Sequence, residues 1–358
     1  MKITPATLTE FRRKLLRWYR ANRRDMPWRG SRDPYRIWVA EVMLQQTRIA
    51  AVLPYYRNFL RRFPTVRSLA SARPAEVLRA WAGLGYYSRA RNSHQAAKEI
   101  VARHGGNFPR SQDAALTLPG IGRYTAAAVL SIAYDVPLAA LDGNVARVLA
   151  RLAALRGDLR SPRRWRQLES GAQRLLAQDS AGDWNQALME LGETLCTPRN
   201  PRCGVCPVAR FCLARSRGLV NQIPAPRRKR APVQMRIAAA VLLDPCGRTL
   251  LVRDPGAHDG VLFSRMWQFP AVEVTAAPER ELKKHLAATL GIETNGFAAL
   301  REARHGVTFR NIVLLPFLAR VKRLPRGARS RILPIHGLAQ IPVSSATRKI
   351  AQAALESV

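Results

Sequence analysis

The chain has 358 residues and carries a large positive charge. Hydrophobic residues make up 47% and charged residues 23%, a composition that is typical of globular proteins and excludes a disordered chain. Lys and Arg total 59 against 24 Asp and Glu, so the net charge is +35. This charge favours a polyanionic partner, most of all nucleic acid, over a basic surface that serves solubility alone. No apolar run approaches the ~18–20 residues that span a bilayer, and charges stand where a signal peptide needs an apolar stretch. We therefore expect neither a membrane protein nor a secreted protein.

Residues 1–215 have the pattern of a helical domain. Apolar side chains recur at spacings of three and four, as in residues 37–44, and short Gly- and Pro-containing segments separate the periodic stretches. We expect a compact all-helical domain of about ten short helices. Residues 216–232 are rich in Pro and Arg and lack periodicity, which predicts an exposed linker. Its RRKR run is equally compatible with a phosphate contact and with a solvated segment.

Residues 233–358 mix strand and helix patterns. The predicted elements are a β-hairpin at 236–254, a strand at 267–274, a helix at 279–292 and a strand pair at 306–324. We therefore expect a smaller α+β domain after the helical one.

Four of the five cysteines lie close together, at Cys196, Cys203, Cys206 and Cys212. Their spacing, C-x6-C-x2-C-x5-C, allows one short loop to wrap a single metal centre. Four thiolates suit either tetrahedral zinc or a [4Fe–4S] cluster, and the spacing does not separate the two. Because the loop also carries arginines, a centre held there would brace a basic loop against a phosphate backbone, which is a structural role. Cys246 lies apart and is expected to be a turn or core residue.

A glycine pair, Gly120 and Gly122, lies in the segment LPGIG before an apolar helical stretch. Such a turn exposes backbone N–H groups at the positive end of a helix, where they can hold a phosphate. The alternative is an ordinary turn between two helices. The whole segment resembles the helix-hairpin-helix of DNA repair glycosylases.

Asp142 follows this hairpin in the segment LDGN, and alone it would be read as a helix N-cap. The order of hairpin, Asp and four-cysteine loop, however, resembles the endonuclease III superfamily, in which this Asp is catalytic. Bifunctional members carry a lysine in the second helix of the hairpin, and its amine forms a Schiff base with the sugar. This chain has Tyr124 at that position, so the resemblance implies a monofunctional glycosylase.

Further segments narrow the resemblance. They are PWR at 27–29, DPY at 33–35, WVAEVMLQQT at 38–47, GLGYYSRARN at 83–92 and NQALM at 185–189. With the hairpin and the cysteine loop, they closely resemble the MutY family of adenine DNA glycosylases over residues 20–215. The resemblance implies a helix-hairpin-helix glycosylase domain at 1–215 with a [4Fe–4S] cluster rather than zinc, and a MutT-like, Nudix-type domain at 233–358.

The resemblance also implies roles for individual residues. Glu41 would be the general acid that protonates adenine at N7, and its apolar neighbours favour a protonated carboxyl. Asp142 would stabilise the positive charge that develops on the sugar, as one carboxylate does in glycoside hydrolysis. Tyr124 and Asn144 would position Asp142 and the sugar. The remaining implied roles are an adenine pocket of Trp28, Arg29 and Gln186, a wedge of Gln46 and Tyr86 beside the opposite base, contacts to that base from Thr47 and Leu84, and phosphate binding at Gly120 and Gly122.

The C-terminal domain departs from the family pattern at two places. The family's Phe-Ser-His loop is replaced by Val307-Thr308-Phe309, in which Thr308 can supply the serine hydroxyl but the histidine is lost. The selectivity for the lesion is therefore open. A pyrophosphohydrolase would need a helix with clustered glutamates for Mg²⁺; here His285, Ala288 and Thr289 fall on the three acidic positions, so that activity is not expected.

The expected function is removal of adenine mispaired with 8-oxoguanine or guanine, by a monomer acting on duplex DNA in a bacterial cytoplasm, at the chromosome. The base would have to be flipped out of the stack to reach the catalytic groups. A glycosylase that removes thymine is an alternative, but protonation at N7 by Glu41 applies only to purines, because thymine has no N7. A catalytically idle lesion-binding protein is another, and the presence of both Glu41 and Asp142 argues against it.

Overall fold

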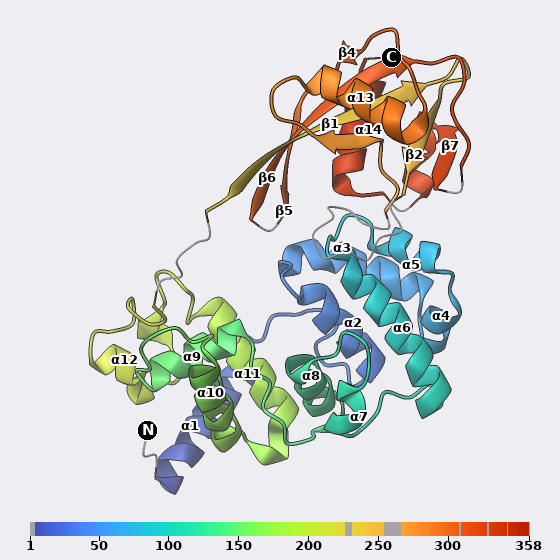
Figure 1. The fold of residues 1–358 in the computed structure, drawn as a ribbon. Helices are drawn as coiled ribbons and strands as arrows, with labels where there is room; N and C mark the ends of the chain where they lie inside the picture. Colours follow the sequence, from blue (N-terminus) through green and yellow to red (C-terminus); the bar gives the residue numbers. More distant parts are fainter. Residues whose placement is uncertain are drawn as a thin grey trace. The chain divides into compact units, whose positions relative to one another are not determined.

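The computed structural model describes residues 4–225, 231–253, 266–307, 309–327, 329–341 and 343–357 (Figure 1). The chain divides into two compact units, one of residues 1–72 with 88–228 and the other of residues 73–87 with 229–358. Within the described ranges, no helix is long and apolar enough to cross a membrane.

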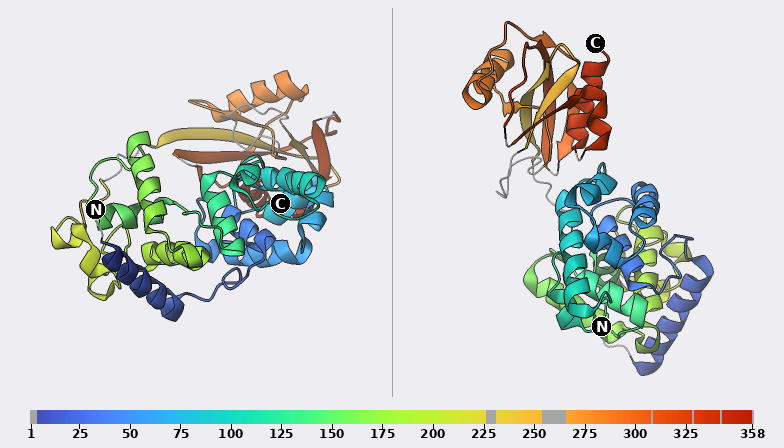
Figure 2. Two further views of the ribbon diagram at one scale, coloured as in Figure 1. Left: turned by 90° about the horizontal axis from the view of Figure 1, so that it is seen from below. Right: turned by 90° about the vertical axis from the view of Figure 1, so that its right-hand side faces the viewer.

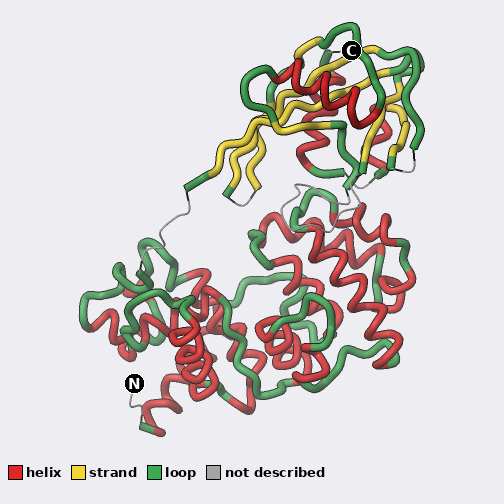
Figure 3. The backbone as a smooth tube through the Cα atoms, viewed as in Figure 1, coloured by secondary structure: helices red, strands yellow, loops and turns green. Residues whose placement is uncertain are grey.

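The first unit is built from helices, as the sequence predicts, and Figure 3 shows helix and loop throughout it. Its α-helices are α1 (Pro5–Asn22), α2 (Pro34–Leu44), α3 (Ile49–Arg62), α4 (Val66–Ser71), α6 (Tyr87–His104), α7 (Gln112–Leu116), α8 (Arg123–Tyr134), α9 (Gly143–Leu152), α10 (Pro162–Leu175), α11 (Ala181–Thr194) and α12 (Leu213–Ser216). Short 3-10 turns lie at Gln178–Ser180, Cys203–Val205 and Ala209–Phe211. Helix α5 (Pro74–Trp81) belongs to the second unit.

Side-chain caps explain where several of these helices begin. Thr4, Asp33, Ser111, Asp142 and Ser161 each precede a helix and accept a hydrogen bond from a backbone N–H of its first turn. Proline occupies the first turn of α1, α2 and α10, where its missing N–H has no intrahelical partner to lose.

The interior of the helical unit is organised around α8, α9 and α11. Helix α8 packs on α2, α7 and α11, while α9 packs on α10, α11 and α12. All of residues 125–133 of α8 and 145–152 of α9 are buried. The side chains on every side of these two helices are therefore either hydrophobic or polar groups with hydrogen-bond partners. One core cluster joins α1, α9, α10 and α11 to the cysteine loop. That cluster includes Ile223, which is buried although the sequence predicts an exposed linker from residue 216 onward.

Within its described residues, the second unit contains a seven-stranded mixed sheet, which confirms the α+β prediction. Its strands are β1 (Val233–Leu243), β2 (Arg248–Val252), β3 (Ala271–Glu273), β4 (Ala298–Ala299), β5 (Ala303–Val307), β6 (Arg310–Arg320) and β7 (Ser330–Pro334). The order is β4-β6-β1-β2-β7, with β3 paired to β1 and β5 paired to β6. The predicted hairpin β1–β2 is antiparallel. Strands β5 and β6 are also antiparallel, but β5 begins before the strand pair predicted at 306–324, most of which is the single strand β6. The longest pairing joins β1 and β6 in parallel, from Val233↔Arg310 to Leu243↔Arg320.

One helix covers each face of this sheet, as the right-hand view of Figure 2 shows. Ala238, Ala240 and Leu242 of β1 lie in the core under α13 (Pro278–Leu290), whereas the alternate residues of β1 lie in the core under α14 (Ser345–Leu355). Because successive side chains of a strand point to opposite faces, one apolar strand serves both cores. Helix α13 matches the predicted helix at 279–292 and ends at Gly291, whose φ of +63° suits glycine.

Candidate active site and metal centre

A cavity of about 870 Å³ lies inside the helical unit, with walls from α2, α8, α11 and the start of α9. Nine residues of the predicted site line it: Trp28, Arg29, Glu41, Gln46, Thr47, Tyr124, Asp142, Asn144 and Gln186. They come from segments spread over about half of the chain, so the fold, not local sequence, brings them to one place.

Glu41 is the buried carboxyl of this cavity. It lies on α2 with 6% of its surface exposed, and its Oε2 accepts a hydrogen bond from Tyr124 Oη at 2.7 Å. Burial raises the pKa of Glu41 to about 7, although the bond from Tyr124 acts in the opposite direction. Glu41 can therefore carry a proton near neutral pH, which a general acid needs.

Asp142 is a carboxylate held in a different environment. It caps α9, and its Oδ1 accepts a hydrogen bond from the backbone N–H of Val145 at 2.7 Å. Burial raises the pKa of Asp142, while the N–H groups of Val145 and Asn144 counteract this rise. The positive end of α9 also favours its ionised form. Asp142 can thus cap α9 and still act as a reactive carboxylate. Glu41 and Asp142 lie in environments that suit two different roles, a proton donor and an anion.

Tyr124 and Asn144 lie beside these carboxyl groups with partners of their own. The hydroxyl of Tyr124 bonds to Glu41 and contacts Met189 Sδ at 3.8 Å. Burial raises the pKa of Tyr124 well above its usual value, so the hydroxyl stays a neutral donor. Asn144 Oδ1 accepts a hydrogen bond from Arg147 Nη2 at 2.8 Å. The sequence analysis expects Tyr124 to position Asp142, but in the structure its hydroxyl donates a hydrogen bond to Glu41.

Sequence reasoning missed a group of charged residues at the cavity, of which Arg24, Arg29 and Glu193 line it. Glu190 on α11 is fully buried between two guanidinium groups. Arg24 donates to it through Nε at 2.5 Å and Nη2 at 2.9 Å, and Arg29 donates through Nη2 at 2.5 Å. Arg24 also pairs with Glu193. The local signal was weak: Glu190 interrupts the apolar run 187–191 one turn after Gln186, but Asp183 and Glu193 are charged residues of the same helix.

Arg29 has an unused hydrogen-bond donor. Its side chain is 10% exposed, and its guanidinium lies 5.4 Å from the centre of the Tyr19 ring. Nη1 of Arg29 is buried and has no hydrogen-bond partner within the described part of the chain. Since a buried donor without an acceptor is costly, this atom is suited to a ligand that enters the cavity.

The end of α2 turns sharply and directs Gln46 and Thr47 into the cavity wall. Gln46 has a φ of +56°, a conformation that is strained for residues other than glycine. Arg89 from α6 supports the turn: Nη1 donates to three carbonyls at the end of α2, and Nη2 donates to Thr47 Oγ1 at 3.1 Å. A buried arginine thus satisfies the last backbone acceptors of the helix that carries Glu41.

The other predicted residues do not line this cavity. Leu84 is buried, whereas Tyr86 is 41% exposed and has a φ of +47°. Thr308 lies outside the described residues. Gly120 has a φ of +77°, and a Cβ there would come within 2.7 Å of Asn92, so only glycine fits. Gly122 is exposed and precedes α8, whose first turn has no side-chain cap; its N–H groups can meet a phosphate.

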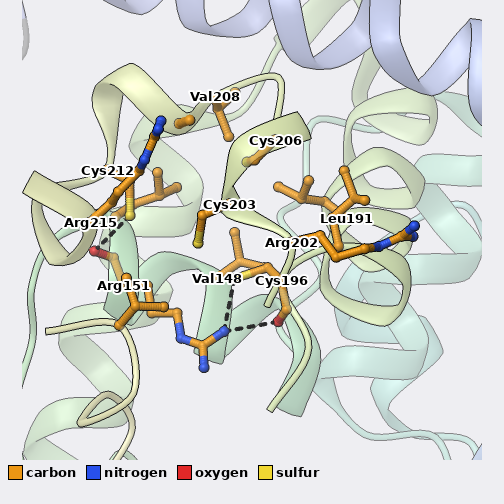
Figure 4. A pocket seen from close by; sticks show the side chains of 14 residues that line it. Val148, Arg151, Leu191, Cys196, Arg202, Cys203, Cys206, Val208, Cys212 and Arg215 are labelled. Atoms are coloured by element: carbon orange, nitrogen blue, oxygen red, sulfur yellow. Dashed lines mark hydrogen bonds between the residues drawn. The ribbon is translucent and has the colours of Figure 1, made fainter. Parts of the chain in front are cut away.

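The four clustered cysteines surround one pocket with apolar walls (Figure 4). All four are free thiols, and burial raises the pKa of Cys206 to about 11, so a nearby cation is needed to make it a thiolate. Buried Arg151 donates to Cys196 Sγ at 3.3 Å. Within the described residues, no three His, Cys, Asp or Glu side chains are placed to hold a single metal ion.

Two family models match the chain. Residues 39–176 match the HhH-GPD superfamily base excision DNA repair protein model, and residues 196–212 match the iron-sulfur binding domain of endonuclease III. The second match covers all four clustered cysteines and confirms the prediction of an iron–sulfur cluster over zinc.

Several relatives are adenine DNA glycosylases. The human enzyme is 46% identical over 229 residues, which cover 62% of this chain and 42% of the human protein. The rat enzyme is 36% identical over 329 residues, with 78% of this chain and 63% of the rat protein covered. The enzyme of Mycolicibacterium smegmatis is 43% identical over 232 residues, with 64% and 78% covered. The chain thus spans about half to two thirds of the length of the mammalian relatives it matches.

Among solved structures, a thermostable thymine-DNA glycosylase matches with a TM-score of 0.54 and 29% identity, covering 59% of this chain and 97% of that one. Endonuclease III in a non-covalent DNA complex matches with a TM-score of 0.50 and 22% identity, covering 60% and 98%. The match to endonuclease III supports the fold of the helical unit.

Proposed function

This chain belongs to the adenine DNA glycosylase family, and on that premise we propose that it hydrolyses the N-glycosidic bond of adenine in duplex DNA. The proposed substrate is adenine opposite 8-oxoguanine or guanine. The observation that carries the proposal is the cavity, which is lined both by Glu41, whose pKa of about 7 allows protonation near neutral pH, and by Asp142, which caps a helix N-terminus. The charge of +35 supports duplex DNA as the partner.

The base must leave the helical stack before these groups can reach it. A cavity of about 870 Å³ falls within the usual range of ligand-binding sites, roughly 300–1,000 Å³. We assign Trp28, Arg29 and Gln186 to the pocket for the flipped adenine. The unused Nη1 donor of Arg29 supports this assignment, because the ring nitrogens of adenine are hydrogen-bond acceptors.

The bond-breaking step needs a better leaving group and a stabilised cation. Glu41 would donate its proton to N7 of adenine, and general acid catalysis of this kind contributes about 10²–10⁴-fold. The carboxylate of Asp142 would then face the positive charge left on C1′ of the sugar. Water then attacks C1′ and releases a proton to the Glu41 carboxylate, which restores the acid and completes the hydrolysis.

The proposed reaction leaves the DNA strand intact. Tyr124 occupies the position at which bifunctional members carry a lysine, and a neutral phenol cannot form an imine with C1′. Its hydroxyl instead holds Glu41 at 2.7 Å. The product is an abasic site, which breaks on treatment with alkali.

Other parts of the chain complete the proposal. Gln46 and Thr47, with Tyr86 and Leu84, would contact the opposite base and fill the gap left by the flipped one. Gly120 and Gly122 would bind the DNA backbone, and the iron–sulfur cluster would brace the basic loop around Cys196–Cys212. We propose a monomer acting on chromosomal DNA in a bacterial cytoplasm, with a glycosylase domain at 1–215, a linker at 216–232 and a MutT-like domain at 233–358 that reads the lesion, Thr308 included.

Thymine removal is the second candidate, because the matched thymine-DNA glycosylase has the same fold at 29% identity. The two candidate activities require different roles of Glu41. Departure of a purine is assisted by protonation at N7, an atom that thymine lacks. A buried, protonated carboxyl therefore favours adenine.

The test is single-turnover cleavage of duplexes that contain A opposite 8-oxoguanine, A opposite G, T opposite G, and 8-oxoguanine opposite C. Strand breaks are measured with and without alkali for the wild type, Glu41→Gln and Glu279→Gln, the last being an exposed glutamate of α13 that serves as the charge-matched control. We expect alkali-dependent breaks at adenine in the wild type and the control. We expect their loss, by about 10²-fold or more, in Glu41→Gln.

Cleavage at T opposite G would establish thymine removal instead. Tight binding without cleavage of any duplex would leave a lesion-binding protein. Equal rates of adenine removal opposite 8-oxoguanine and opposite guanine would support the glycosylase activity and contradict selectivity for 8-oxoguanine.

A further inference from the structure

We propose that Glu190 is a positioning residue of this reaction: its buried carboxylate fixes Arg29 and neutralises it, so that the acid Glu41 faces no uncompensated cation. The inference rests on the proposed function, because it concerns the group that protonates the base. It assigns Glu190 no contact with the substrate.

The geometry around Glu190 is that of a carboxylate built to hold two guanidinium groups. Both oxygens are used: Oε1 accepts from Arg24 Nε at 2.5 Å, and Oε2 accepts from Arg24 Nη2 at 2.9 Å and from Arg29 Nη2 at 2.5 Å. None of its side chain is exposed, and these ion pairs hold its pKa below the usual value despite the burial. Such a carboxylate stays ionised through the pH range of the reaction.

Glu190 acts from behind the cavity wall. Arg24, Arg29, Met189 and Glu193 line the cavity, but Glu190 does not. It lies on α11 one turn after Gln186, and its carboxylate accepts hydrogen bonds from the two arginines that do line the cavity. Its influence on the chemistry must therefore pass through the positions and charges of those arginines.

The groups that face Glu41 come from four segments. Tyr124 of α8 donates a hydrogen bond to it, Asp142 and Glu193 raise its pKa as like charges, and Arg29 lowers it as a cation. Arg29 already has one buried donor, Nη1, that lacks a protein acceptor in the described ranges. Without Glu190, Nη2 would also lose its acceptor, and Arg29 would be a mobile, unneutralised cation beside Glu41.

Loss of Glu190 should therefore change the pH dependence of the reaction and not its rate alone. The reaction needs protonated Glu41, so its rate falls as pH rises through the pKa of that group, about 7. An uncompensated Arg29 stabilises the ionised carboxylate and lowers this pKa. The falling limb of the pH profile should then move to lower pH by about one unit, which is a loss of about tenfold at pH above the wild-type midpoint.

The experiment measures single-turnover excision of adenine opposite 8-oxoguanine from about pH 5 to 9. Glu190→Gln is compared with the wild type and with Asp183→Asn, which removes one carboxylate from the same helix, where it pairs with Arg20 at the surface. We expect the shifted midpoint in Glu190→Gln and the wild-type midpoint in Asp183→Asn. The double variant Glu190→Gln/Arg29→Gln should return to the wild-type midpoint at a lower plateau rate, because the cation is then absent.

The outcomes separate this inference from the proposed function. A Glu190→Gln protein that loses rate equally at every pH overturns the inference and shows a structural role. If Glu190→Gln fails to fold, as judged by circular dichroism, Glu190→Asp and the double variant are used; a double variant with a shifted midpoint also overturns it. If the wild type excises no base, the proposed function fails, and the titration of Glu41 is followed by ¹³C NMR of labelled glutamate, with Glu41→Gln identifying the signal. An unchanged titration in Glu190→Gln then rejects the inference independently.

Discussion

At the scale of residues, the proposed chemistry depends on how two carboxyl groups are surrounded. Glu41 has one hydrogen-bond donor, the Tyr124 hydroxyl, in a buried site that raises its pKa to about 7. Burial raises the pKa of Asp142 as well, but hydrogen bonds from backbone N–H groups at the start of α9 counteract this rise and favour its charged form. Two residues with the same functional group can thus serve as acid and as anion because the fold gives one of them a helix terminus and the other an apolar wall.

The bond between Tyr124 and Glu41 gives a prediction whose sign is opposite to that for Glu190. Tyr124→Phe removes a hydrogen bond that lowers the pKa of Glu41, so that pKa should rise. Glu41 then keeps its proton to higher pH, and the falling limb of the pH–rate profile should move upward. Single-turnover excision across pH measures this shift, with Tyr134→Phe as the control on the same helix, since its hydroxyl bonds to the Phe108 carbonyl. A downward shift would mean that Tyr124 does not act on the acid through this bond.

At the scale of elements, α2 links the acid to the residues proposed to contact the opposite base. Glu41 lies in its last turns, and Gln46 and Thr47 follow its end. Arg89 of α6 ties this end down through three backbone carbonyls and the Thr47 hydroxyl. The strained backbone at Gln46 persists because these contacts determine it from outside the helix.

Arg89→Met should therefore lower both the stability of the protein and the rate of excision. It leaves carbonyl groups at the end of α2 without their donor, which costs about 1–3 kcal/mol for buried acceptors. We expect a lower melting temperature and slower excision with an unchanged pH midpoint, because the surroundings of Glu41 keep their charges. Arg103→Met, an exposed arginine on the same helix, is the control. A shifted pH midpoint in Arg89→Met would contradict this prediction, because it would show that Arg89 also affects the pKa of Glu41.

At the scale of the whole molecule, the success of sequence reasoning depends on how far apart in the chain the partners are. The hairpin β1–β2 joins neighbouring strands and is predicted, whereas the parallel pairing of β1 with β6 joins strands far apart and is missed. Glu41 and Asp142 stand out through their immediate neighbours. Glu190 does not, because its partners Arg24 and Arg29 lie 166 and 161 positions earlier in the chain. No local pattern records a contact of that kind.

The net charge gives a prediction that belongs to the molecule and not to any one site. A protein with 59 Lys and Arg against 24 Asp and Glu should bind duplex DNA largely through phosphates, with release of counterions. If it neutralises about 6–10 phosphates, its affinity should fall by about 10³–10⁵ between 50 and 200 mM salt. Fluorescence anisotropy of a labelled duplex over a salt series measures the slope.

The same titration with a mispaired and a fully paired duplex separates two sources of affinity. Phosphate contacts do not depend on the base pair, so both duplexes should lose affinity with similar slopes while the mispaired one stays tighter throughout. Glu41→Gln is the form to use, because it removes the proposed acid, blocks turnover during the measurement and changes the net charge by one unit. An affinity that hardly changes with salt would show that the positive charge serves solubility, and that recognition of the duplex rests on base contacts.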